Sequence, residues 1–328
     1  MEINIPNENM LNFTLYFNIE SGKSVMVDWG IQGVSPVEYI ATQNGYLEAS
    51  SDGIYSEPGT YRVKVYPKSQ EDVLTIGSIT KSNKRYGLMG VYNNMELQAY
   101  RNMVKSIHIG KGAILGNYGL ANFYHLEYIT FNSDHLEIGQ YACQDCIFLT
   151  SVILPSSSAG VEIGESAFYN CHALNILSLP YNIKSIGLNA FYSCYALNVF
   201  NYYNPFLENI NIANSFVKNA RGLKAQINMG ENVTMIANQA FQDCSSVEKI
   251  KYFGNLQGST VGQNAFSTCY SLYIYDFRYC TSPPALPGIT STYIYLTENT
   301  KIYISDEYKQ NWLSASNWAN LDEYYVYV

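Results

Sequence analysis

The chain has 328 residues, 47% of them hydrophobic, so it is long enough for more than one domain and apolar enough to bury a sizeable core. A formal net charge of −8 and a sequence pI near 5.1 argue against a protein that binds nucleic acid or an anionic membrane surface. Only 14% of the residues are charged, whereas 31 are tyrosines, a composition that suits recognition outside the cell.

The first 75 residues predict a small β-sandwich. Residues 11–19, 24–29 and 60–66 alternate polar and apolar side chains and are separated by Gly, Pro, Asn and Ser, as short strands are. Polar residues interrupt the run 11–19 and no basic segment precedes it, so it predicts neither a signal peptide nor a membrane span. If the protein is exported, its signal or anchor sequence lies outside this sequence.

Residues 115–280 contain an internal repeat. One copy reads Ile163-Gly-Glu-Ser-Ala-Phe-Tyr-Asn-Cys171-His-Ala-Leu174-Asn-Ile-Leu-Ser-Leu-Pro180. Copies begin at 115, 138, 163, 186, about 211, 236 and 261, so the period is 23 to 25 residues. The copy at 211–227 is irregular, and there we assign Phe216 and Leu223 to the Phe and Leu positions with one residue displaced. This register predicts a solenoid, in which each unit buries its apolar face only against its neighbours.

Within each repeat, the last residues, such as 174–179, alternate in the direction of their side chains as a strand does. The Ala-Phe-x-x-Cys run is expected to form a helical turn. The recurring phenylalanines are expected in the core, as a ladder along the stack: Phe168, Phe191, Phe241 and Phe266. Residues 76–112 are expected to cap the first repeat, with strands at 74–79 and 104–109. After Pro283-Pro284, a strand, a helix capped by Ser305, and Trp312 and Trp318 are expected to close the other end.

The pair Cys143-x-x-Cys146 could form a redox or zinc site, but five cysteines share one repeat position, so the spacing follows from the register. We therefore interpret the cysteines as small core residues, while neighbours in the stack could reach disulfide distance. The histidines lack metal-binding spacing, and no nucleophile elbow, phosphate loop or paired carboxylates occur. Asp28, Asp52 and Glu57 leave open a calcium site, although solvated loops explain them. We predict a protein that is not an enzyme and needs no cofactor or metal.

The pattern I-G-x-x-A-F-x-x-C-x-x-L-x-x-I-x-L-P resembles the BspA-like leucine-rich repeats of bacterial surface proteins. That resemblance implies a right-handed solenoid displayed outside the cell, with adhesion or binding to host matrix as its role. Near the N-terminus, Val27-Asp-Trp-Gly30 and 55–65 resemble the paired motifs of PKD-type Ig-like domains, but Ile31-Gln32 stands where Asp-Gly is usual. The expected domains are therefore a PKD/Ig-like β-sandwich at 1–75, a capped leucine-rich repeat solenoid at 76–280, and a C-terminal cap at 281–328.

Strand alternation also predicts which side chains line the concave sheet, the usual contact surface of such arrays. The candidate ligand-binding strip comprises Tyr128, Thr130, Ile153, Ile176, Ser178, Val199, Asn201, Tyr203, Gln226, Asn228, Lys249, Lys251 and Asp276. We expect a monomer outside the cell or at its surface that binds a protein or peptide through this strip. A glycan ligand, or a spacer role without a ligand, is the alternative.

Overall fold

The computed structural model describes residues 1–92, 94–111, 113–132, 136–154, 160–179, 183–198, 200–202, 210–212, 215, 217–223, 225–230, 233–252, 260–286 and 294–328. At 136, 176–178, 200–202, 210–212, 225 and 234 only the backbone is described. The chain divides into two compact units, Met1–His172 and Ala173–Val328. The predicted mainly β solenoid is confirmed, since both units are mainly β and carry stacked coils.

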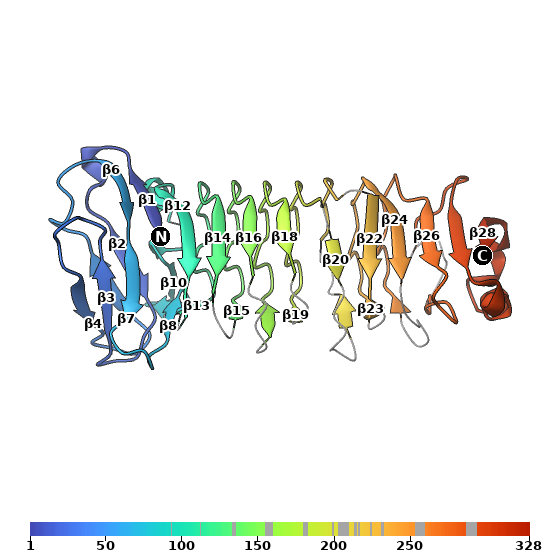
Figure 1. Cartoon of the computed structure of the whole chain (residues 1–328), viewed down its shortest axis with the longest axis horizontal. Helices are drawn as coiled ribbons and strands as arrows, with labels where there is room; N and C mark the ends of the chain where they lie inside the picture. The colour runs from blue at the N-terminus through green and yellow to red at the C-terminus, as the bar shows by residue number, and fades with distance from the viewer. Residues whose placement is uncertain are drawn as a thin grey trace. The chain divides into compact units, whose positions relative to one another are not determined.

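The first unit opens with antiparallel strands whose side chains enclose Trp29. The strands pair as β6–β1, β2–β5 and β4–β3–β7 (Figure 1). Trp29 is buried, its ring meets Phe13 edge-on at 5.8 Å, and its carbonyl accepts a hydrogen bond from the Tyr55 hydroxyl. The PKD/Ig-like fold expected for residues 1–75 stays a prediction. The bounds are β1 Glu2–Ile5, η1 Glu8–Met10, β2 Thr14–Phe17, β3 Ser24–Asp28, β4 Val37–Ile40, β5 Leu47–Ser50, β6 Gly59–Arg62 and β7 Lys64–Pro67.

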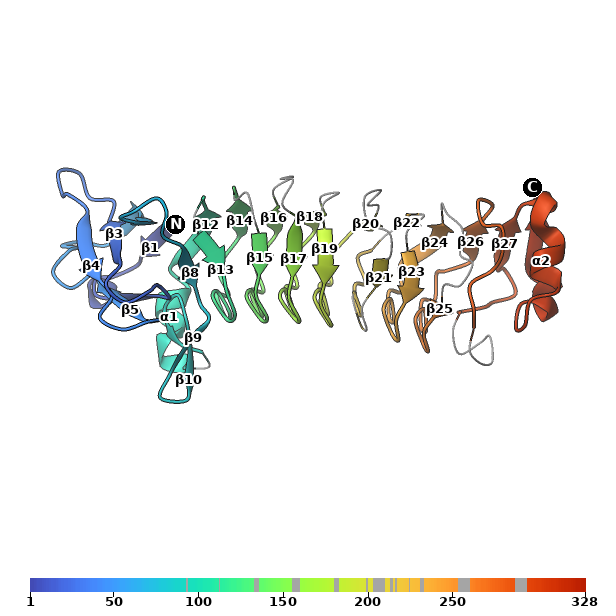
Figure 2. The same cartoon turned by 90° about the horizontal axis from the view of Figure 1, so that it is seen from below.

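The coils of the first unit contribute strands to two parallel sheets, which the two views separate (Figures 1 and 2). One runs β12–β14–β16, and β1 covers its free edge by pairing antiparallel with β12. The other runs β8–β13–β15–β17. The strands expected at 74–79 and 104–109 are therefore present as the edge of the stack. The bounds are β8 Leu74–Ile76, β9 Ile79–Lys81, β10 Lys84–Gly87, β11 Gly90–Val91, η2 Met95–Leu97, α1 Gln98–Arg101, β12 Val104–Ile109, β13 Ala113–Leu115, β14 Tyr128–Phe131, β15 Leu136–Ile138, β16 Ser151–Ile153 and β17 Val161–Ile163.

The second unit repeats this arrangement. Its longer parallel sheet runs β20–β22–β24–β26–β27–β28, and its shorter one runs β21–β23–β25. The bounds are β18 Ile176–Ser178, β19 Ile183–Ile186, β20 Phe200–Tyr202, β21 Ile210–Ile212, β22 Ala225–Met229, β23 Val233–Ile236, β24 Val247–Tyr252, β25 Thr260–Val261, β26 Ile274–Phe277, β27 Lys301–Ile304, η4 Asp306–Tyr308, α2 Lys309–Leu313, η5 Ala319–Tyr324 and β28 Tyr325–Tyr327.

The expected core ladder is confirmed. Phe168, Phe191, Phe241 and Phe266 are all buried. The rings of Phe241 and Phe266 stack at 5.5 Å with 7° between their planes. The apolar period of the sequence thus becomes one interior in each unit, because every coil offers the same side chain at the same height.

The Ala-Phe-x-x-Cys run is not the helical turn that its composition suggests. In each coil two residues four apart adopt a left-handed backbone, for example Ser166 (φ 53°) and Asn170 (φ 59°). The backbone N–H groups of these two residues and of the residue midway between them donate to the next coil, as Tyr141 does to the Glu165 carbonyl at 2.9 Å. Asn, Asp and Ser recur at these positions because short polar side chains tolerate this conformation. The turns therefore add a third hydrogen-bonded ladder to the two sheets.

The same pair of left-handed residues corrects our register in the irregular coil. Ser215 and Asn219 carry the positive φ angles there. Their positions place Val217, which is buried, where other coils have Phe. Phe216, to which we assigned that place, lies outside the described residues. Leu223 does occupy the expected Leu position and is buried.

The C-terminal cap closes the second unit as expected. The Ser305 side chain accepts a hydrogen bond from the Glu307 N–H at 3.3 Å and so begins η4. Trp312 and Trp318 are buried, and their rings lie 5.1 and 5.7 Å from that of Phe277 in β26. The last coil therefore covers its apolar flank with tryptophan.

Candidate binding surface

Strand alternation sets one face of each longer sheet outward, and the parallel register lines up the outward residues of successive coils. In the first unit, Tyr128 pairs with Ser151 and Thr130 with Ile153. In the second, Gln226 pairs with Lys249, Asn228 with Lys251, and Lys251 with Asp276. The described members of the predicted strip thus stand side by side within each unit.

The first unit presents apolar and aromatic side chains on this face. Tyr128 and Ile153 are 45% and 55% exposed. Where the strands begin, Phe148 is 53% exposed and its ring meets His125 edge-on at 5.6 Å. These two rings line an open hollow of about 330 Å³ with Lys105, Glu127 and Thr150. Exposed apolar groups of this kind favour contact with a protein or peptide.

For five residues of the predicted strip, the structure does not describe the side chain. Val199 and Tyr203 lie outside the described residues. For Ile176, Ser178 and Asn201 the backbone alone is described, and it lies in β18 and β20. The apolar run that we expected across Ile153, Ile176 and Val199 therefore remains a sequence-based prediction.

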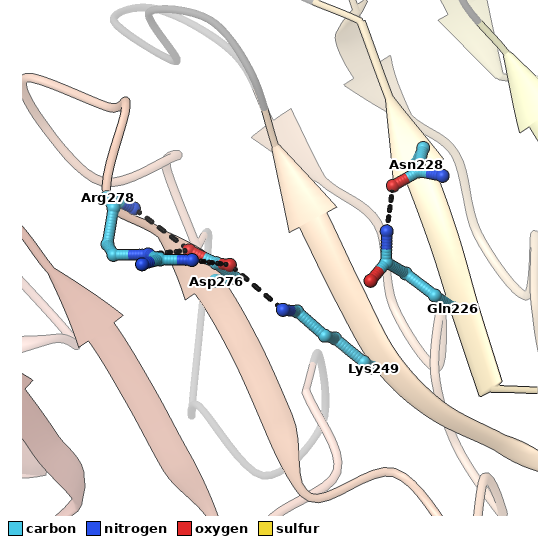
Figure 3. Close-up of polar contacts among 5 residues, drawn as sticks. All are labelled: Gln226, Asn228, Lys249, Asp276 and Arg278. Atoms are coloured by element: carbon cyan, nitrogen blue, oxygen red, sulfur yellow. Dashed lines mark hydrogen bonds and ion pairs between the residues drawn. The ribbon is translucent and has the colours of Figure 1, made fainter.

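The second unit carries an ion-pair cluster on its outward face (Figure 3). Arg278 holds the Asp276 carboxylate with two hydrogen bonds, Nε to Oδ1 at 2.9 Å and Nη2 to Oδ2 at 2.8 Å. Lys249 approaches from the other side, with Nζ 3.1 Å from Oδ2. Beside them, the Gln226 amide donates to the Asn228 carbonyl oxygen. We expected an exposed Asp276, but its side chain is only 1% exposed because the two cations cover it.

The cluster keeps Asp276 ionised. Burial pushes the pKa of this carboxyl upward, but the hydrogen bonds and charges of Arg278 and Lys249 outweigh burial and hold the pKa below its ordinary value. The Arg278 and Lys249 side chains remain 40% and 26% exposed. One carboxylate therefore neutralises one of two cations that still face the solvent.

Sequence reasoning missed three outward residues of this region. Arg278 follows Asp276 by two positions and thus shares its face, while Lys301 and Tyr303 lie in β27, which pairs parallel with β26. The Arg278 guanidinium lies 5.9 Å from the Tyr303 ring, and the Lys251 ammonium lies 5.3 Å from the Tyr279 ring. The alternation of Lys301, Ile302 and Tyr303 could have revealed this strand's outward face, but we assigned it to the cap.

The cysteines show no sign of catalytic activation. All seven are buried and none forms a disulfide among the described residues, and burial raises the pKa of the Cys143 thiol well above its ordinary value. Thiols of the ladder donate to carbonyls of the preceding coil, as Cys146 does to Leu120 at 3.1 Å and Cys269 to Phe241 at 3.1 Å. A protonated, buried thiol is a poor nucleophile and a poor metal ligand.

In the described part of the chain, no group of three or more His, Cys, Asp or Glu residues could hold a metal ion. No helix among the described residues is long and apolar enough to span a membrane.

The family model described as "BspA type Leucine rich repeat region (6 copies)" matches residues 98–224, 161–286 and 210–307. Together these segments cover more than half of the chain. The chain belongs to the BspA-type leucine-rich repeat family. This family consists of repeat proteins that are generally not enzymes. The BspA-type pattern accounts for the coils, the Phe ladder and the cysteine ladder.

Similar solved structures include a leucine-rich repeat protein of T. pallidum, at 17% identity and TM-score 0.41, covering 60% of this chain and 86% of that one. A leucine-rich cell surface protein of Faecalibacterium prausnitzii A2-165 has 17% identity and TM-score 0.48, and the match covers 71% of this chain and 66% of that one. A leucine-rich repeat protein of Bacteroides ovatus has 14% identity and TM-score 0.29, and the match covers 77% of this chain and 97% of that one. No curated protein matches the chain.

Proposed function

We propose that the chain is a non-catalytic protein of the bacterial cell surface that binds an extracellular protein or peptide through the outward face of its longer sheets. The single observation that carries the proposal is the set of cations around Asp276. Lys249 and Arg278 share its carboxylate, and Lys251 and Lys301 lie on the same face. On a chain of net charge −8, this local excess of positive charge favours a partner segment rich in Asp or Glu.

Aromatic rings beside these cations suit a peptide partner further. Tyr303 and Tyr279 lie next to Arg278 and Lys251, and Tyr279 is 54% exposed. Arg and Tyr are the residues most enriched at the energetic centres of protein interfaces. A partner segment that alternates acidic and apolar residues would meet both kinds of side chain.

Binding is tested with the purified full chain and two fluorescein-labelled peptides, one alternating Glu and Val and one alternating Lys and Val. The first is expected to bind, more weakly as salt rises, and the second is not. Lys251→Glu should weaken binding about tenfold, by like-charge repulsion at the interface. Lys84→Glu is the matched control, since it makes the same charge change on the exposed hairpin strand β10. Equal losses in the two variants would refute a specific site on the sheet.

Exposure at the cell surface is tested separately. Intact cells that produce the full-length gene product are treated with protease, and the chain is followed with an antibody. Loss of the signal without cell lysis supports the proposal. Full protection in intact cells together with digestion after lysis contradicts it.

A further inference from the structure

The left-handed turns offer a second surface, on a different edge of the coils from the strand face. In the first unit, the first left-handed position of two successive coils holds Tyr118 and Tyr141. Their rings stack at 5.0 Å with 13° between the planes, and Tyr92 extends the stack at 4.6 Å from Tyr118. The Arg85 guanidinium covers the Tyr118 ring at 4.8 Å. Aromatic side chains therefore fill this edge over these two coils.

In the second unit, the same position holds short polar side chains. The backbone bonds establish the equivalence, because the N–H of Gln239 donates to the Gln263 carbonyl as that of Tyr118 donates to Gln140. The residues there are Asn189, Ser215, Gln239 and Asn264, all with positive φ. Instead of stacked rings, this edge has a hollow of about 420 Å³, which Leu188, Asn238 and Gln263 also line. That volume is in the range of small-ligand sites, about 300–1,000 Å³.

The chemistry of the hollow is neutral and dominated by carboxamides. None of its described lining residues is charged. The Asn238 side chain has a structural role, since its Oδ1 accepts from the Gln263 N–H at 2.8 Å. By contrast, the carboxamides of Asn189, Gln263 and Asn264 have no hydrogen-bond partner within the part of the chain that is described. Asn189 lies in the first of four successive coils and Gln263 and Asn264 lie in the fourth, with Ser215 and Gln239 in the coils between them. The three carboxamides leave both donors and acceptors available.

We propose that this hollow binds a neutral oligosaccharide. A carboxamide donates through its NH₂ and accepts through its carbonyl, which matches a sugar hydroxyl that does both. A polar side chain recurs at this position in each of the four coils, which lie about 4.8 Å apart, the spacing of paired strands, so a chain of sugar rings can follow the stack. Because no cation lines the described part of the hollow, carboxylated or sulfated sugars gain no charge attraction there.

A peptide is a poorer fit to the same place. Peptides that bind along an edge do so by pairing with free backbone groups. Here the turn N–H groups of Ser215, Gln239 and Asp243 already donate to the next coil. Leu188 is also the only apolar side chain among the described lining residues, so side-chain pockets for a peptide are lacking.

The test uses the full chain on an array of neutral oligosaccharides, with uronic-acid and sulfated chains for comparison. Gln239→Tyr should fill the hollow with a phenol ring, as tyrosines do at the equivalent positions of the first unit. Tyrosine is tolerated in this backbone conformation, since Tyr118 and Tyr141 adopt it in the first unit with φ of 58° and 55°. We expect the wild type to bind at least one neutral class, and Gln239→Tyr to weaken that binding tenfold or more while its melting temperature stays near that of the wild type.

Gln263→Ala provides a second variant, because it removes one carboxamide at an exposed position whose φ is not positive. It should weaken the same binding several-fold. Gln140→Ala is the matched control, because Gln140 is exposed and precedes Tyr141 in the first unit as Gln263 precedes Asn264 in the second. It removes the same carboxamide away from the hollow and should leave glycan binding unchanged. Binding of acidic chains only, binding of no glycan, or equal affinity of folded Gln239→Tyr and wild type would each overturn the proposal.

Discussion

Replacing Asp276 by Asn removes the negative charge from the ion-pair cluster and preserves the size of the side chain. Asp276 accepts two hydrogen bonds from Arg278 and lies 3.1 Å from the Lys249 ammonium. Asn retains one acceptor, while its NH₂ faces groups that themselves donate. Breaking a fully buried ion pair costs about 3–5 kcal/mol. Since Arg278 and Lys249 are 40% and 26% exposed, water can solvate them, and the expected loss of unfolding free energy is about 2–3 kcal/mol at pH 7.

The pH dependence separates this charge effect from a packing defect. The folded-state pKa of Asp276 lies below its ordinary value of 3.8, so the ion pairs stabilise the fold fully above that value. As the pH falls through the folded-state pKa, the wild type takes up a proton there and loses this stability, whereas the carboxamide of the Asp276→Asn variant does not titrate. The difference between the two proteins should therefore shrink in acid.

The assay is urea denaturation followed by tryptophan fluorescence, which Trp312 and Trp318 beside Phe277 make sensitive to this region. Both proteins are compared at pH 7 and in steps down to strong acid. Lys251→Met serves as the control on the same strand face and should change stability by less than about 1 kcal/mol. A difference between wild type and Asp276→Asn that is absent at pH 7, or constant with pH, would refute the reasoning.

Three further predictions concern the ladders. Phe241→Ala should cost about 3–5 kcal/mol by urea denaturation, since it leaves a cavity beside Phe266; a cost near 1 kcal/mol would show that the core collapses there. Asn170→Ala should cost about 2–3 kcal/mol, from left-handed strain and a lost hydrogen bond to Asp145, whereas Asn170→Gly should cost only about 1 kcal/mol. Burial raises the pKa of Cys269 and of Cys280 to about 12, so the buried thiols keep their protons while the unfolded chain loses its own above the ordinary value of 9.0. The free energy of unfolding should therefore fall as the pH rises from about 9 toward 12. A free energy of unfolding that stays constant over this interval in urea titrations would contradict this.

The period and the core could be predicted from the sequence because they depend on one-dimensional spacing. Apolar residues that recur every 23 to 25 positions have to share an interior, and Phe168, Phe191, Phe241 and Phe266 do so. The cysteine register followed from the same spacing. The edge strands and the Ser305 cap were likewise predictable from local patterns.

The turn conformation and the charge cluster could not be predicted in this way. A left-handed residue such as Ser166 is stabilised by bonds between coils, which local composition does not reveal. The signal was present in the Asn, Asp and Ser residues that recur four positions apart. Asp276 is buried by Arg278, two residues away in sequence, and by Lys249 of the neighbouring strand, with β27 on the other side. Its environment therefore depends partly on lateral pairing over some 50 residues of chain.

Within each unit, the turn ladder of the described residues gives the coils a direction. Its N–H groups donate to the following coil, while the ladder thiols donate back to the preceding one. Each of these coils thus has hydrogen-bond donors on one flank that match carbonyl acceptors of the next coil, and thiols on the other flank that match carbonyls of the preceding coil. Copying one repeat and inserting it in frame would leave both junctions chemically matched, so a gene of this kind can lengthen or shorten its stack of coils by unequal recombination without redesigning any interface.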